Sequence, residues 1–228
     1  MRPDLTLNFL ILFLVSLFVA DSAYSINAKV LRQDVKPATQ KMLEHQEIDN
    51  AILADTDYVK ASFAGPTSAA VLTTTTFSNQ PDVPRALTIT PAGTTTDVES
   101  CVVTVTGTNF FGAVISETFA FAADASTATA GVKAFKTVTS ASWAADCESG
   151  GFAATWIIGV GDVLGLKRCM AQAGDLVFTV FDGAYETTRA TTVADVNEVE
   201  KNTIDINGTL NGAKDIDAYF IQNWACLP

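Results

Sequence analysis

Histidine is almost absent from this sequence, which has a single one, His45, in 228 residues. A Ser-His-Asp or Cys-His triad therefore has only one candidate base, and no G-x-S-x-G motif accompanies it. Glu44 and Glu47 stand near His45, and a lone histidine in a charged segment is most often a solvated side chain. We therefore expect no catalytic residues and a protein that is not an enzyme.

The motifs that hold phosphates and metal ions are also missing. Neither G-x-x-x-x-G-K-[ST] nor G-x-G-x-x-G occurs, so no phosphate-binding loop is expected. The four cysteines lie far apart: Cys101, Cys147, Cys169 and Cys226. They form no C-x-x-C or cysteine–histidine cluster, which argues against structural zinc. Asp55-Thr-Asp57 is too short for a calcium loop. We expect neither a cofactor nor a metal ion.

Basic side chains are few, because 14 Lys and Arg stand against 25 Asp and Glu and the formal net charge is −11. A general basic surface for nucleic acid is therefore excluded, and acidity of this size mostly keeps a protein soluble. Hydrophobic residues make up 48% of the chain and charged residues only 17%. Such a chain can bury a full core and is not disordered by composition.

The cysteines leave two alternatives open. In an oxidising compartment, or in an assembled particle outside a cell, the four cysteines can form two disulfides in three different pairings. Alternatively they are apolar thiols in the core of a sheet.

Alternating apolar and polar residues dominate the stretch from Pro81 to Ser140. Each alternating run predicts a strand with one buried face. The runs are Arg85–Thr90, Cys101–Thr106, Ile115–Phe121 and Val132–Thr139. Gly107–Gly112 carries two glycines and an asparagine, as a reversal of the chain requires, so an antiparallel hairpin is expected there.

Strand patterns continue to the end of the chain. Ala153–Val160 predicts a strand that ends in a turn at Gly161-Asp162, and Asp175–Phe181 runs into Asp182-Gly183, a strong hairpin signal. Asp217–Gln222 predicts the last strand. Eight to eleven short strands at this spacing predict an all-β protein, an antiparallel β-sandwich or a barrel-like domain.

Residues 1–25 have the marks of a secretory signal peptide. Arg2 precedes an apolar run that ends near Ala20, and small residues follow it. The run is short for a membrane-spanning helix, so no membrane is expected in the mature form. The alternative is that translation starts at Met42, which begins an ordinary polar segment.

The predicted organisation has three parts. Residues 1–25 are the leader or an upstream extension, residues 26–66 an N-terminal arm, extended or helical, and residues 67–228 the antiparallel β-sandwich domain. Pro37 interrupts the arm.

Carboxylates and tryptophans leave room for a carbohydrate-active enzyme as a third, weaker hypothesis. However, Glu117 falls on the polar side of the run Ile115–Phe121, so we expect it to be exposed. Trp143, Trp156 and Trp224 are more typical of a core or an interface than of a sugar-binding face.

Several stretches together resemble virion proteins of tailed bacteriophages. They are spread in order along the chain: Pro81–Thr90, Val103–Asn109 with Ile115–Phe119, Lys133–Ser140, Gly159–Leu166, Glu200–Ile206 and Asp215–Ile221. Each is a strand with its turn, so the resemblance is to a scaffold. The apolar leader departs from the pattern of these virion proteins and favours the start at Met42.

The resemblance implies a capsid decoration protein or another head-associated component, located in the virion, with a tail or neck role as the next choice. Its partners would be the major capsid protein or other virion proteins, in a homo-oligomer or symmetric assembly, with the N-terminal arm ordering on assembly. The alternative from a different class is a secreted or cell-surface β-sandwich adhesin or filament subunit.

Overall fold

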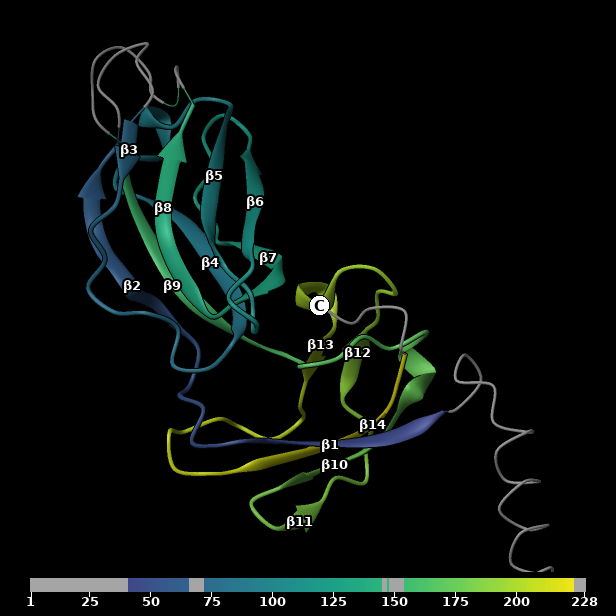
Figure 1. Ribbon diagram of the computed structural model, residues 1–228. Coiled ribbons are helices and arrows are strands. Elements are labelled where there is room, and N and C mark those ends of the chain that lie inside the picture. Colours follow the sequence, from purple (N-terminus) through teal and green to yellow (C-terminus); the bar gives the residue numbers. More distant parts are fainter. Residues whose placement is uncertain (1–40, 66–71, 145–146, 148–153, 224–228) are drawn as a thin grey trace, which may run out of the picture. The chain divides into compact units, whose positions relative to one another are not determined.

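A computed structural model of the chain describes residues 41–65, 72–144, 147 and 154–223 (Figure 1). These residues form fourteen strands and three short 3-10 helices, with no α-helix among them, which confirms the predicted all-β class. The helices are η2 (Thr95–Asp97), η3 (Ala173–Asp175) and η4 (Val199–Lys201). No helix in the described ranges is long and apolar enough to cross a membrane. The predicted leader and the first part of the predicted arm lie outside these ranges.

The first of three sheets has four strands in the order β1-β14-β10-β11. Its strands are β1 (Met42–Ile48), β10 (Leu176–Phe181), β11 (Ala184–Tyr185) and β14 (Ile216–Gln222). β1 lies antiparallel to β14 along its whole length, from Met42 opposite Gln222 to Ile48 opposite Ile216. The first strand of the described chain is thus paired with the last.

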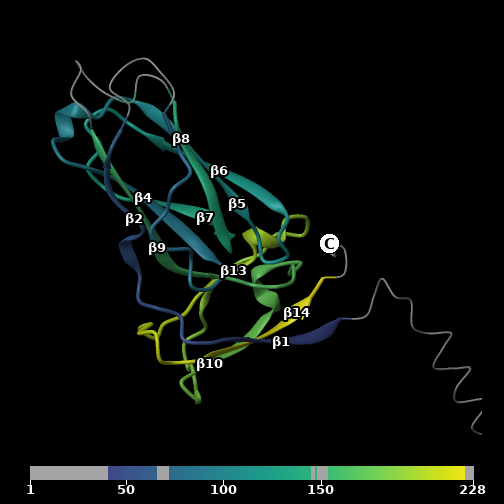
Figure 2. The same ribbon diagram turned by 60° about the vertical axis from the view of Figure 1, so that its left-hand side comes forward.

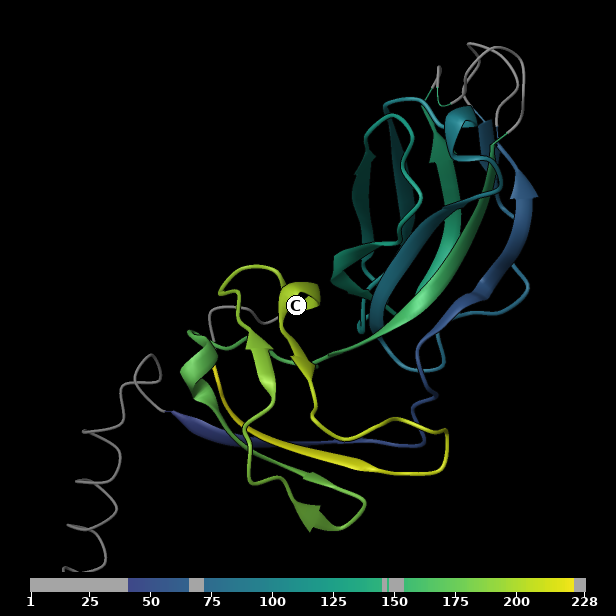
Figure 3. The ribbon, with the colours of Figure 1, turned by 180° about the vertical axis from the view of Figure 1, so that it is seen from behind.

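The second sheet has six strands, in the order β12-β13-β9-β4-β7 with β2 also pairing with β9. The strands are β2 (Asp55–Ala64), β4 (Arg85–Ala92), β7 (Thr129–Phe135), β9 (Thr155–Gly165), β12 (Thr191–Val193) and β13 (Thr203–Asp205). β9 is their longest member and pairs with β2, β4 and β13. The view from behind shows β9 as the long green strand of this sheet (Figure 3).

The third sheet has the order β3-β8-β5-β6. Its strands are β3 (Leu72–Thr74), β5 (Cys101–Thr108), β6 (Val114–Phe121) and β8 (Thr137–Trp143). In β5, Val103 and Val105 are buried while Thr104 and Thr106 are partly exposed, as the alternation predicts. The predicted hairpin from β5 to β6 is confirmed by their antiparallel pairing.

Two separate hydrophobic cores lie under these sheets. The first fills the space between the sheet of β2, β4 and β9 and the sheet of β5, β6 and β8, which gives the sandwich-like arrangement visible in the turned view (Figure 2). The second lies beneath the sheet of β1, β14 and β10. β9 supplies both, because Trp156 and Ile158 belong to the first core and Leu164 to the second.

One predicted strand is two strands in the structure. The run Val132–Thr139 was expected to be continuous, but the chain changes sheets at Lys136, so that β7 pairs with β4 and β8 pairs with β5. Lys136 N–H donates to the Thr108 carbonyl (2.8 Å), and Phe135 is fully buried at this corner. The alternation breaks at this corner, where the apolar pair Ala134-Phe135 is followed by the polar pair Lys136-Thr137, and this break marks the change of sheet.

The turn predicted at Gly161-Asp162 is wrong, because β9 runs without interruption from Thr155 to Gly165. A glycine inside a strand often marks a close backbone approach rather than a reversal. At Gly159 a Cβ atom would lie 2.3 Å from the Asp55 carbonyl oxygen, because the backbone of β2 crosses directly over it. The Gly161 carbonyl accepts a hydrogen bond from Nε of the buried Arg85 (2.7 Å).

The predicted arm extends too far into the domain. Residues 42–48 and 55–64 were placed in it, but they form β1 and β2, and their side chains Ile48 and Val59 are buried in the two cores. The turn at Asp182-Gly183 is confirmed, with φ angles of 53° and 73°. The sequence predicts a returning strand over Tyr185–Thr192, but β11 is shorter and ends at Tyr185.

The close approach at Gly159 makes a testable prediction. Gly159→Ala should lower the free energy of unfolding by about 2–3 kcal/mol, because β2 must move away from β9. Gly161→Ala in the same strand is the matched control, since its Cβ would lie 3.6 Å from the nearest atom, and it should cost less than about 1 kcal/mol. Urea denaturation measures both; equal effects would contradict the crossing of β2 over Gly159.

The pairing of β1 and β2 makes a second prediction. A chain that begins at residue 42 should still unfold cooperatively on heating. A chain that begins at residue 61 should not, because it lacks β1 and the buried Ile48 and Val59. Near-ultraviolet circular dichroism during heating checks this, and cooperative unfolding of the shorter chain would contradict it.

Candidate functional site

The outer face of the sheet β1-β14-β10-β11 carries a row of aromatic rings. Along β14 the residues Ile216, Ala218 and Phe220 are buried in the second core, while Tyr219 and Ile221 alternate with them on the other side and are partly exposed. This alternation follows from the pleat of the strand. The partners of Tyr219 in neighbouring strands therefore also lie on the outer face.

Strand register places one ring on each of the four strands. His45 lies opposite Tyr219 on one side and Phe178 lies opposite Tyr219 on the other. The ring centroids are 4.5 Å apart for His45 and Tyr219, 4.4 Å for Tyr219 and Phe178, and 5.8 Å for Phe178 and Tyr185. We call these four residues the aromatic row.

The rings support one another physically. Stacked aromatic pairs contribute about 0.5–1.5 kcal/mol each beyond the area they bury. His45 is held further by Asp217, whose Oδ1 lies 2.6 Å from His45 Nε2. The only histidine of the chain is therefore engaged by a stacked ring and a carboxylate, both from β14. Each ring in the row is positioned before any partner arrives.

Aliphatic side chains flank the aromatic row. Tyr185 is 62% exposed, Leu43 is 58% exposed, and Val177, at the bulge next to Phe178, is 47% exposed. A contiguous exposed apolar patch usually marks an interaction site. The row can therefore bind a partner by burying a preformed apolar surface.

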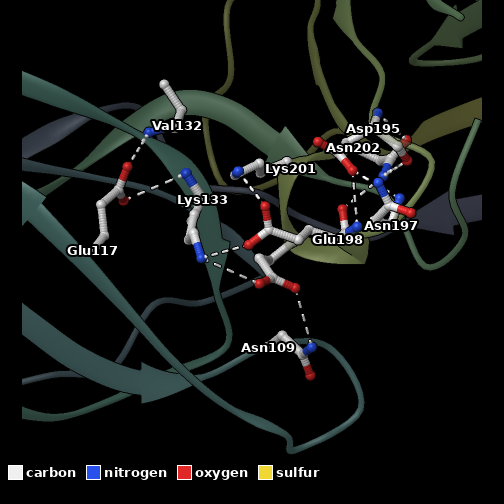
Figure 4. A network of polar contacts seen from close by, with 10 residues as sticks. Asn109, Glu117, Val132, Lys133, Asp195, Asn197, Glu198, Lys201 and Asn202 are labelled. Atoms are coloured by element: carbon white, nitrogen blue, oxygen red, sulfur yellow. Dashed lines mark hydrogen bonds and ion pairs between the residues drawn. The ribbon is translucent and has the colours of Figure 1, made fainter. Parts of the chain in front are cut away.

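A cluster of polar side chains, separate from the aromatic row, connects β6, β7 and η4 (Figure 4). Glu117 on β6 accepts hydrogen bonds from the backbone N–H groups of Val132 (2.6 Å) and Lys133 (3.4 Å) on β7. β6 and β7 belong to different sheets, and β6 is the edge strand of its own. The Glu117 carboxylate thus takes the place of a strand partner for β7.

The side chain of Lys133 continues the cluster to η4. Its ammonium group lies 2.9 Å from Glu198 Oε1 and 3.4 Å from Glu200 Oε1. Asn109, in the loop between β5 and β6, donates to the buried Glu200 (3.4 Å), and Lys201 pairs with Glu198. Loops from three parts of the chain are joined by these contacts, which we call the polar brace.

Asn202 fixes the backbone that carries the brace. Its fully buried side chain accepts hydrogen bonds from Met170 N–H (2.8 Å) and Asp195 N–H (3.1 Å) and donates to the carbonyls of Asp195 and Glu198. All hydrogen-bonding atoms of the Asn202 amide are satisfied. The position of Glu198 is therefore determined by a neighbouring side chain as well as by its own ion pairs.

The pKa values follow from these contacts. Burial raises the pKa of Glu117 above its ordinary value, although its two backbone donors oppose this. For Lys133, burial alone would lower the pKa, but the hydrogen bonds and charges of Glu198 and Glu200 outweigh it and raise the pKa. Hydrogen bonds from Lys201 and Lys133 lower the pKa of Glu198. Lys133 therefore stays an ammonium ion at neutral pH and is a structural cation rather than a nucleophile.

The described residues also line a small cavity and hold a cluster of carboxylates. A cavity of about 200 Å³ beside the end of β4 is lined by Pro91, Gly93 and Val98, among others, and no lining residue is titratable. Its size is below that of typical ligand sites, about 300–1,000 Å³. The carboxylates of Glu47, Asp49 and Asp215 lie within 4.8 Å of one another, but all three residues are exposed, as is common in an acidic protein.

The structure confirms some predictions made for single residues and contradicts others. Trp143 and Trp156 are buried in the first core with ring centroids 6.0 Å apart, which confirms a core role, and Trp224 lies outside the described residues. The expected exposure of Glu117 is wrong. Glu117 lies on the same side of β6 as the buried Ile115 and Phe119 and is half-buried, and the absence of a side chain at Gly131 leaves room on β7 for its carboxylate.

The cysteines are divided between both alternatives. Cys169 is disulfide-bonded. Cys101 and Cys147 are buried thiols of the first core.

Comparisons with known protein families, curated proteins and solved structures give no match to this chain.

Phe178, Tyr185 and Tyr219 were not singled out from the sequence. Tyr219 is 174 residues from His45 along the chain, and only the pairing of β1 with β14 brings the two rings together. The alternation does not single out Phe178, because it groups Phe178 with Leu176 and Val180, whereas the structure buries Thr179 on the other side of the strand.

The raised pKa of Glu117 predicts a pH effect on stability. Because the folded protein holds this proton more tightly than the unfolded chain, the contribution of Glu117 to the free energy of unfolding is present at low pH. It is lost as pH rises from 4.5, the ordinary value, through the raised value. Glu117→Gln removes this loss. The stability of the variant relative to the natural protein should therefore increase with pH across that window.

Urea denaturation at a series of pH values measures this difference. Thr118→Val on the same strand removes no titratable group, and its curve should run parallel to that of the natural protein. A flat or falling difference for Glu117→Gln would contradict the burial of its carboxylate.

Proposed function

We propose that this chain is a non-enzymatic virion structural protein, specifically a capsid decoration protein that binds the assembled shell through its aromatic row. The observation that carries the proposal is the exposed row itself, with one ring from each of the four strands and exposed aliphatic neighbours. The resemblance of the strand segments to virion proteins of tailed bacteriophages supports it.

The geometry of the row suits repeated binding to equivalent sites. Aromatic side chains dominate the energetics of protein interfaces, and tyrosine is among the most frequent hot-spot residues. Rings that are already stacked lose little conformational entropy on binding, so more of the contact free energy remains as affinity. His45, Tyr219 and Phe178 are stacked in this way. A decoration protein needs such a preformed surface because it binds many copies of one shell protein.

Charge supports the same proposal. The chain carries a net charge of −11, which keeps an unattached subunit soluble. The outward positions beside the row on β1 and β14 include the carboxylates Glu47 and Asp217. The partner surface, on the major capsid protein or another virion protein, would then be apolar at its centre with basic side chains at its border.

A second candidate function is a secreted or cell-surface adhesin or filament subunit. The disulfide bond of Cys169 favours it, because disulfides persist mainly in oxidising environments outside the cytoplasm. Location separates the two functions. Phage-like particles purified from a producing culture should carry the chain in fixed proportion to the major capsid protein across a density gradient. Recovery only from cell surfaces or particle-free medium would contradict the virion proposal and favour the adhesin.

The role of the row is tested by Tyr185→Ser. Loss of an exposed hot-spot ring should weaken binding to particles stripped of this protein at least about tenfold, equivalent to about 1.4 kcal/mol. The melting temperature should fall by no more than about 4 °C, because Tyr185 is mostly exposed and its ring contacts only that of Phe178 in the row. Co-sedimentation over a range of protein concentrations measures the affinity.

Val102→Ser is the matched control. Val102 is exposed on β5, in a different sheet from the row, and its change should leave binding unaltered. Undiminished binding of Tyr185→Ser, or an equal loss with Val102→Ser, would overturn the assignment of the row as the docking surface.

A further inference from the structure

Two buried thiols contact each other in the first core. Cys101 is the first residue of β5 and Cys147 lies shortly after the end of β8. Both are buried in the first core, and the side chain of Cys147 lies close enough to Cys101 to lower the pKa of its thiol. They are 46 positions apart in the sequence, so the contact is a product of the fold.

Backbone hydrogen bonds hold the two cysteines side by side. Ala144 N–H donates to the Val102 carbonyl (3.0 Å), which extends the pairing of β8 with β5 beyond Trp143. Glu99 N–H donates to the carbonyl of Cys147 itself (3.3 Å). These two bonds bracket the cysteine pair. The two cysteines therefore lie on neighbouring, hydrogen-bonded segments and are buried in the same core, which is the arrangement that a disulfide requires.

We propose that Cys101 and Cys147 form a disulfide bond in the mature protein, as a second covalent link besides that of Cys169. The proposal selects one of the pairings that the sequence leaves open. It is independent of the proposed function, since a virion outside a cell and a secreted protein both meet oxidising conditions.

The reaction is a thiol–disulfide exchange with a small disulfide such as oxidised glutathione. One cysteine, as thiolate, attacks a sulfur of the oxidant, its S–S bond breaks and one reduced glutathione leaves. The second cysteine then attacks the mixed disulfide and releases the other glutathione. Two protons and two electrons pass from the protein thiols to the oxidant, and one S–S bond replaces another.

The environment favours Cys101 as the first nucleophile. The hydrogen bond from Cys147 lowers the pKa of the Cys101 thiol, against the opposing effect of burial. A lower pKa increases the fraction of thiolate, which is the reacting species. Because both sulfur atoms are buried, the exchange must occur before folding is complete or during local opening.

The link would tie the beginning of β5 to the segment after β8. Cross-linking reduces the conformational freedom of the unfolded chain, and more so for longer loops. The loop closed between Cys101 and Cys147 contains β5, β6, β7 and β8. Three of these strands make up most of one sheet of the sandwich.

Thiol counting on the full chain tests the proposal. The reduced, unfolded protein is refolded in a glutathione redox buffer, unfolded again without reductant in the presence of iodoacetamide, and examined by intact mass and by peptide mapping without reduction. We expect no alkylated cysteine and a linked peptide pair that contains Cys101 and Cys147. Alkylation of both residues, or a link from either to another cysteine, would overturn the proposal.

Variants separate this link from that of Cys169. In Cys169→Ser, the matched control, the pair Cys101–Cys147 should still form. In Cys101→Ser, Cys147 should become alkylated, and the rest of the map should not change. A linked peptide pair between Cys147 and another cysteine in Cys101→Ser would contradict the proposed pairing. If a variant fails to fold, the map of the natural chain alone decides.

Discussion

The fold depends on one strand that serves two cores. β9 contributes Trp156 and Ile158 to the sandwich core and Leu164 to the second core. It pairs with β2, β4 and β13. It can do so because Gly159 lets the backbone of β2 cross at a distance that no side chain permits. Close to this crossing, the buried Arg85 donates to the Gly161 carbonyl and pairs with Asp82. A buried cation of this kind is tolerated only when its donors are used, and here the backbone of β9 uses them.

The candidate docking surface follows from this arrangement. The second core fixes which face of β1, β14 and β10 is buried, and the pleat then presents the opposite face, with the aromatic row, to solvent. The polar brace joins β7 to β6 and to η4. Glu117 satisfies backbone donors that have no strand partner, and Lys133 ties the same strand to η4. The charges of the brace are therefore used to join sheets, while the rings of the aromatic row are left for a partner.

Local signals predicted local structure well. Asp182-Gly183 was recognised as a hairpin because both residues can adopt positive φ, which is a property of the dipeptide itself. β5 and β6 were predicted because their alternation covers the whole strand. The errors have two origins. The uninterrupted β9 at Gly161 depends on a neighbouring strand that the local pattern does not contain. The corner at Lys136 and the half-buried Glu117 had local signals, because the alternation breaks at Ala134-Phe135 and Glu117 shares the side of Ile115 and Phe119.

The sequence by itself determined the all-β class, most strand positions and the acidic character of the chain, because these depend on residue type and on a period of two. Only the tertiary structure decided that residues 42–64 belong to the sheets and which thiols face each other. It also decided that one ring from each of four strands forms a single row. The physical reason is strand register. The alternation of a strand predicts which side of the sheet a residue faces, but the pairing with the neighbouring strand determines which side chains lie next to it.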